Sequence, residues 1–160
     1  MLTRTHLAIS IFFILLFFPF FENKFVFCGV MFVSTLLPDI DSSRSKLGKN
    51  FLLRPLQFFF GHRGILHSFT FALMVSMLIF FFSQEASIAF FFGYGLHLLV
   101  DSLTVRGITP LYPISKKWKG VIKTGGWSEV IIFVILILVN IALLIFRLPF
   151  LFNFITYLIN

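Results

Sequence analysis

Long apolar runs separated by short polar segments make up most of this chain. Their approximate bounds, in chain order, are 7–21, 25–38, 65–82, 86–100 and 130–146, with a shorter run at 148–159. We expect the first five runs to be transmembrane helices, because a helix in lipid satisfies its own backbone hydrogen bonds. The shorter runs cross only if their ends enter the headgroup zone or the bilayer thins locally. The pattern leaves open whether the last run crosses, re-enters or lies flat.

The composition agrees with a membrane protein. Of the 160 residues, 59% are hydrophobic and 12% are charged, and phenylalanine alone accounts for 26. A soluble fold of this size cannot bury so much apolar surface. The sequence therefore predicts an all-α, polytopic membrane helix bundle of about five transmembrane helices with a polar site facing the cytoplasm. Residues 1–160 are expected to form a single domain.

The first apolar run has the position of a signal peptide, yet we expect it to be retained. It ends in Phe-Phe-Pro-Phe-Phe before Glu22, which offers no small-residue cleavage site. The only cysteine, Cys28, lies inside the second apolar run. An internal disulfide is therefore excluded, and redox chemistry is not expected.

Basic residues concentrate in two connections between the runs. One connection carries Arg44, Lys46, Lys49, Arg54 and Arg63, and another carries Arg106, Lys116, Lys117, Lys119 and Lys123. If the helices alternate in direction, both lie on one side, and the positive-inside rule places that side, with the N-terminus, in the cytoplasm. The net charge of +7 also indicates contact with anionic membrane lipids. Nucleic-acid binding is not expected, because no basic stripe interleaved with aromatic residues is present on a soluble module.

The histidines and aspartates gather near the same predicted end of the helices. All four histidines and all three aspartates of the chain belong to this group: His6, Asp39, Asp41, His62, His67, His97 and Asp101. Glu129 begins the fifth predicted helix on the same side, whereas Glu22 and Glu85 lie in the outer links. Because ionisable side chains at membrane depth are costly, this grouping indicates a functional site.

The spacing of these residues tells which of them share a helix face. His97 and Asp101 are four residues apart, so a helix places them about 40° apart and one turn from each other. We expect this pair to ligate a common metal. His62 and His67 are five apart and would diverge on a continuous helix, which favours His62 in an entry turn and His67 on the first helical turn.

The donor atoms of the group indicate which metal would bind. Imidazole nitrogens and carboxylate oxygens without a thiolate suit Zn²⁺, with Mn²⁺ or Fe as alternatives. The candidates outnumber the four ligands of one tetrahedral ion, so two or more ions fit the set. Paired ions polarise a phosphoryl or carbonyl oxygen and activate a bound water, so hydrolysis is the favoured reaction class.

Each motif has a simpler interpretation when it stands alone. The His97–Asp101 pair can hold two helices together, and the PDID segment at 38–41 can be a helix stop followed by a cap. Glu129 can be a carboxylate favoured by a helix dipole. Two other function classes also stay open. A metal-ion transporter would need polar residues at the bilayer midplane, and a non-catalytic scaffold would hold a structural metal with no open position.

Further residues are candidates for roles beside the ligands. Asp41 and Glu129 are candidates for the general base. Arg63 can grip a phosphate or carboxylate, or simply supply positive charge on the cytoplasmic side. Ser68 and Ser102 are adjacent to proposed ligands and can hydrogen-bond to them, although the pattern favours ordinary helix hydroxyls.

Aromatic and turn-forming residues indicate where the membrane surface lies. Tyr112, Trp118 and Trp127 fit an interfacial aromatic belt. The segment RGITPLYP at 106–113 reads as a turn from its glycine and proline content, and we expect it to form a floor of the site.

Five segments, taken in order, resemble the YdjM-like family. They are Thr-His at 5–6, LPDIDS at 37–42, HRGILHS at 62–68, GLHLLVDSLTVRGITPLYP at 95–113 and TGGWSE at 124–129. The patterns HRGxxHS and HxxxDxxTxxGxxxLxP are specific, and the match spans nearly the whole chain. Members of this family are small inner-membrane proteins classed by inference as metal-dependent hydrolases, some under LexA control. The resemblance implies location and reaction class but supplies no substrate.

The family is distantly similar to the zinc-dependent phospholipase C and single-strand nuclease superfamily. That similarity implies a phosphoester substrate and a ligand set drawn from His6, Asp39 or Asp41, His62, His67, His97 and Asp101. Members of the superfamily also use a second HxxxD pair and a processed N-terminal residue as ligands. This sequence shows neither, so the number of metal ions is left open.

Taken together, these observations predict a membrane-bound, metal-dependent phosphoesterase of the inner membrane. Because the site is expected at headgroup level, a phospholipid is one substrate that fits and another phosphoester is the alternative. The pattern indicates no oligomeric state.

Overall fold

The computed structural model describes residues 1–41, 64–114 and 116–159. The described residues form α-helices joined by turns and by one longer segment at 103–126, and the only strand-like pairings among them are two isolated bridges. The prediction of an all-α fold is therefore confirmed. The α-helices are α1 Thr3–Phe17, α2 Lys24–Leu36, α4 Phe69–Phe80, α5 Gln84–Ser102 and α6 Trp127–Ile159. Three short 3₁₀ helices accompany them: η1 Phe18–Phe20, η2 Leu37–Asp41 and η4 Ile65–His67.

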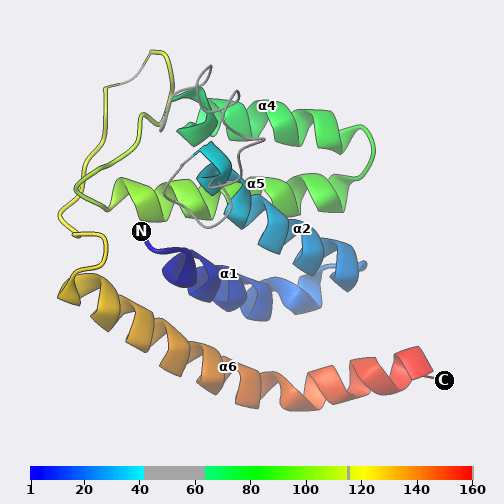
Figure 1. Cartoon of the computed structure of the whole chain (residues 1–160). Helices are drawn as coiled ribbons and strands as arrows, with labels where there is room; N and C mark the ends of the chain where they lie inside the picture. Colours follow the sequence, from blue (N-terminus) through cyan, green and yellow to red (C-terminus); the bar gives the residue numbers. More distant parts are fainter. Residues whose placement is uncertain (42–63, 115, 160) are drawn as a thin grey trace.

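Successive helices run in opposite directions (Figure 1). α5 lies at the centre and packs against α2 and α4, while α1 packs against α2 and holds α6 on its other side. The beginning of α1, the end of α5 and the beginning of α6 consequently lie at the same end of the bundle (Figure 1). We call this the site end, and the end that carries the 81–83 and 21–23 turns the far end.

Helix length separates these elements into two groups. Thr3–Phe20 and Trp127–Pro149 are each long and apolar enough to cross a membrane, with mean hydropathies of 1.6 and 3.1. α2 and α4 have 13 and 12 residues, which correspond to only about 20 Å of helix each, against a hydrocarbon core of about 30 Å. By length and apolar composition together, two of the five expected spans are therefore supported in the described residues.

α6 combines two of the apolar runs in the sequence. The runs at 130–146 and 148–159 belong to one continuous helix of 33 residues with Pro149 inside it. The ribbon of α6 changes direction in its second half (Figure 1), which fits a proline, since proline removes a backbone donor and crowds the preceding turn. The last run is thus a continuation of α6.

A glycine sets the distance between α2 and α5. A Cβ at Gly93 would lie 2.1 Å from Ser34 Oγ and 2.7 Å from Met31 O. Only a residue without a side chain therefore allows the helices to approach this closely. At this close contact the Thr35 hydroxyl donates to the backbone of both helices, at 2.7 Å to Met31 O and 3.3 Å to Gly93 O.

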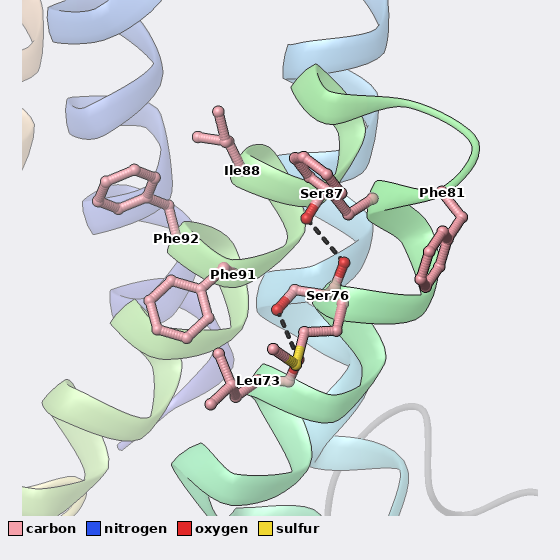
Figure 2. A pocket seen from close by; sticks show the side chains of 9 residues that line it. Leu73, Ser76, Phe81, Ser87, Ile88, Phe91 and Phe92 are labelled. Carbon is pink, nitrogen blue, oxygen red and sulfur yellow. Dashed lines mark hydrogen bonds between the residues drawn. The ribbon is translucent and has the colours of Figure 1, made fainter.

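The far end differs in character from the site end. Glu85 at the start of α5 accepts hydrogen bonds from the backbone N–H groups of Glu22, at 2.7 Å, and Asn23, at 3.1 Å. A cavity of about 630 Å³ lies nearby between α4 and α5. Phe81 and Phe91 are among its lining side chains (Figure 2). Its polar groups are serine hydroxyls, such as that of Ser87, which donates to Ser76 O at 2.7 Å. Its lining contains no histidine, cysteine, aspartate or glutamate.

We predict that Gly93→Ala destabilises the protein by about 1–3 kcal/mol, because the added methyl group overpacks the α2–α5 contact. Gly29→Ala is the matched control, since nothing lies within 4 Å of a Cβ at that helical position. Thermal unfolding of the detergent-solubilised protein measures both. Equal midpoints for the two variants would contradict the role of Gly93.

Candidate metal centre

Five of the predicted metal ligands meet at the site end. They come from four elements: His6 from α1, Asp39 from η2, His67 from η4, and His97 with Asp101 from α5. Ligand atoms of His6, His97 and Asp101 all lie within 4.8 Å of one another. His67 Nε2 lies 3.9 Å from Asp101 Oδ2, and His97 Nε2 lies 3.9 Å from Asp39 Oδ1. The convergence expected from the alternating helices is present for these residues.

Local sequence explains where each ligand sits. His97 and Asp101 occupy successive turns of one face of α5, as their spacing predicts. Asp39 lies in η2, the turn that ends α2. His67 ends η4, and Ser68 directly after it caps α4 by accepting the Phe71 N–H at 3.2 Å. Each of these predicted ligands is therefore placed by a helix end or a regular helix face.

The two central imidazoles are buried and stacked. The rings of His6 and His97 have centroids 3.9 Å apart with 7° between their planes, and both residues are 0% exposed. His97 Nδ1 lies 2.8 Å from Thr35 O. Because a carbonyl only accepts, Nδ1 carries the proton and Nε2 has a free lone pair directed at the site.

Buried nitrogen atoms in the site have no hydrogen-bonding partner. His97 Nε2 and His6 Nδ1 are both in this state. Buried polar atoms are almost always paired, because leaving them without a partner costs about 1–3 kcal/mol. A divalent cation bound by imidazole and carboxylate groups would supply the missing partner, and the donor set suits zinc. The residues present therefore fit a metal.

The two aspartates differ in their surroundings. The side chain of Asp101 is 2% exposed and forms an ion pair with the amino group of Met1. The side chain of Asp39 is 16% exposed and accepts from the Thr3 hydroxyl at 3.4 Å. Burial raises the pKa of the Asp39 carboxyl, and the nearby His6 opposes this. Asp39 is thus the more exposed of these two carboxylates.

The amino group of Met1 is a site component that the sequence did not reveal. The sequence motifs did not predict that an N-terminal group takes part in the site. In the structure, however, the Met1 amino group contacts Asp101. The available signal was the short distance along the chain between Met1 and His6 in the first turn of α1. The sequence also did not indicate the role of Thr35. Its backbone carbonyl contacts His97 Nδ1, and any residue type has such a carbonyl.

Glu129 holds the beginning of α1 against the beginning of α6. It is 0% exposed, and its Oε1 accepts from the Leu2 N–H at 2.6 Å and from the Thr5 hydroxyl at 2.9 Å. Its Oε2 accepts from the Gly125 N–H at 2.6 Å. The carboxylate thereby caps the N-terminus of α1, where free N–H groups favour negative charge. Its predicted role as a base stays a prediction, while these contacts indicate that it positions His6.

Three predicted site residues are not placed. His62 and Arg63 lie outside the described residues, and of Asp41 only the backbone at the end of η2 is described. The roles of His62 as a ligand, of Arg63 as an anion contact and of Asp41 as a ligand or base therefore stay predictions.

The accessory residues have simple roles where they are described. The Ser102 hydroxyl donates to Leu99 O at 2.6 Å, and the Ser68 hydroxyl donates to Ile65 O at 2.6 Å. Both act as ordinary backbone-bonding hydroxyls. The 106–113 segment is tied to the start of α4, since Pro110 O accepts from the Phe69 N–H at 2.7 Å. It therefore lies close to the segment that carries His67, and its expected role as a floor of the site stays a prediction.

Comparison with known proteins identifies the family. The model of the YdjM inner membrane protein family matches residues 1–159. The chain belongs to the YdjM inner membrane protein family. It is 36% identical over 108 residues to the uncharacterized protein YvsG of Bacillus subtilis (strain 168), covering 61% of the chain and 64% of YvsG. It is 34% identical over 96 residues to the inner membrane protein YdjM of Escherichia coli (strain K12), covering 54% of the chain and 48% of YdjM.

Membership of the YdjM family places the protein in the inner membrane, as predicted. The matched regions span about half to two thirds of these relatives. No solved structure matches the chain. The name of YdjM states a location, and neither relative's name states a reaction.

We predict that the purified protein binds zinc and that His97→Ala or Asp101→Asn reduces the bound metal to below a tenth of wild type, since each change removes a donor from the central group. Metal analysis after gel filtration measures this. Ser102→Ala, on α5 next to Asp101 but bonded to Leu99 O, should retain full metal. Wild-type protein without metal after zinc loading would contradict the site.

We also predict that Glu129→Gln weakens zinc affinity by about 10–100-fold, because the position of His6 loosens when the anionic cap of α1 is lost. Competition with a zinc-binding dye measures the affinity. Glu85→Gln is a matched control, since Glu85 accepts from backbone N–H groups in the same way at the far end. Unchanged affinity in Glu129→Gln with altered pH dependence of turnover would instead assign it as the base.

Proposed function

We propose that the protein is a multi-pass, metal-dependent hydrolase of the inner membrane that acts on a phosphoester at its cytoplasmic face. The observation that carries this proposal is the group His6, His97 and Asp101, buried together with ligand atoms within 4.8 Å and with ring nitrogens that lack partners. Such a group is costly to build in an apolar bundle unless it binds a cation.

Some residues of the centre would hold the metal, and others would lie where the substrate enters. His97, His6 and Asp101 would hold the metal, with His67 and Asp39 as further ligands at its edge. A bound divalent metal supplies Lewis acidity and an activated water at neutral pH. Asp39, the more exposed aspartate, lies where a substrate would enter. Thr35 fixes the tautomer of His97, and Glu129 fixes the start of α1.

A base and an anion contact complete the proposed reaction. Both oxygens of Glu129 already accept hydrogen bonds, so Asp41 is the first candidate to test as the base. Arg63 would neutralise the phosphoryl oxygens of the substrate. The antiparallel order of the helices supports a site end that faces the cytoplasm together with the N-terminus, because the basic connections then obey the positive-inside rule.

Metal transport receives less support from the described residues. Asn140, in the middle of α6, donates its Nδ2 hydrogen to Ala8 O at 2.8 Å, and Ser76 in α4 donates to Leu73 O at 2.9 Å. These groups join helices or bond to their own backbone, and of them only Asn140 Oδ1 is buried without a partner, so they do not form a path of free ligands across the bundle. The other alternative is a non-catalytic scaffold that holds a structural metal. The following experiment distinguishes it from a hydrolase, because such a scaffold would bind metal without turnover.

We predict that the zinc-loaded protein in nanodiscs hydrolyses phosphodiester or phosphomonoester bonds in nitrophenyl phosphates or fluorescent phospholipids. His97→Ala and Asp101→Asn should lower the rate at least about 100-fold, while Ser102→Ala should not change it. Chelation should abolish turnover, and added zinc should restore it. Bound metal without turnover on any of these substrates would favour a structural metal, and turnover that survives His97→Ala would contradict the proposed centre.

A further inference from the structure

The segment between α5 and α6, residues 103–126, is attached firmly to the site end. Ile108 and Trp118 exchange both of their backbone hydrogen bonds, with N–O distances of 2.9 and 2.8 Å. Gly107 adopts a φ of +61°, and a Cβ there would lie 1.8 Å from Trp118 O. We call this segment the 103–126 loop. The described part of its backbone, residues 103–114 and 116–126, is therefore anchored by hydrogen bonds beside the end of α5.

The outer surface of the 103–126 loop is unusually apolar. Ile114 and Val121 are each 92% exposed, Trp118 is 62% exposed and Leu111 is 56% exposed. By contrast, Ile108 of the same loop is 0% exposed. The loop thus has its own buried anchor, while Leu111, Ile114, Trp118 and Val121 are exposed. Indole and aliphatic side chains of this kind favour the interface between headgroups and acyl chains.

Positive charges alternate with these apolar side chains. The basic residues of the loop are all exposed: Arg106, Lys116, Lys117, Lys119 and Lys123. No aspartate or glutamate occurs between residues 102 and 128 in the sequence. The charges therefore have no counterions within the loop, and lysine stems can lie along apolar surface while the ammonium groups reach outward.

We propose that the 103–126 loop binds anionic phospholipid headgroups. Trp118 and Val121 enter the interfacial layer, and the lysines on either side of them pair with lipid phosphates. Charge complementarity carries the assignment, because an apolar surface alone would insert into any bilayer, whereas a run of basic residues without acids selects anionic lipid.

The position of the loop gives this binding a consequence for the metal centre. Thr104 N–H donates to Asp101 O at 3.1 Å, so the loop starts directly from the metal-binding turn of α5. Anionic lipids gathered by the lysines would lie next to the candidate centre. The inference rests on the membrane location of the family and not on the proposed hydrolysis.

Tryptophan fluorescence tests the proposal. The chain has two tryptophans, so Trp127→Phe leaves Trp118 as the reporter. This protein is reconstituted into vesicles of phosphatidylcholine and phosphatidylglycerol in which one or the other lipid carries brominated acyl chains, at equal mole fraction. We expect brominated phosphatidylglycerol to quench Trp118 about twofold more strongly or better, because the lysines enrich it near the loop.

Two multiple variants separate charge from structure. Changing Lys116, Lys117, Lys119 and Lys123 to glutamine should make the two lipids equal as quenchers, whereas changing the same four to arginine should retain the preference. Absence of quenching by either lipid would overturn the insertion of the loop. Equal quenching in the parent, or a preference that survives in the glutamine variant, would overturn the binding of anionic headgroups. Neither metal nor turnover enters the readout, so these outcomes leave the proposed hydrolysis untouched.

Discussion

The hydrogen bond between His97 Nδ1 and Thr35 O, at 2.8 Å, connects helix packing to site chemistry. It forms only because α2 and α5 approach closely at Gly93, where a side chain would collide with Ser34. The bond fixes the imidazole tautomer and leaves Nε2 without a partner inside the bundle. A buried nitrogen in that state is stable only beside a proton donor or a cation. The fold and the candidate centre therefore depend on the same contact.

Carboxylates perform different tasks at the two ends of the bundle. Glu85 at the far end and Glu129 at the site end both accept backbone N–H groups and join neighbouring helices. Asp39 and Asp101 instead face imidazoles. In an apolar bundle each ionised group needs donors or a cation, because solvation by water is lost. This requirement explains why Asp39, Glu85, Asp101 and Glu129 lie at helix ends and each has partners.

α6 is the peripheral helix, and α1 is its main contact. Glu129 and Asn140 are eleven residues apart, or about three turns, so they share the face that meets α1. Their bonds to Thr5 and to Ala8 O bracket His6 along the axis of α1. A helix far from the other ligands thus fixes the position of one of them.

The sequence by itself determined the helical segments and the meeting of His6, His67, His97 and Asp101 at one end, because apolar runs in lipid must be helices and consecutive helices reverse direction. The four-residue spacing of His97 and Asp101 also determined their common face. The tertiary structure alone decided that Thr35 orients His97, that Met1 reaches Asp101 and that Glu129 caps α1. These contacts use backbone atoms and interhelical distances, which leave no pattern along the chain. The continuity of α6 through Pro149 was likewise decided by the structure, since proline can either kink a helix or end it.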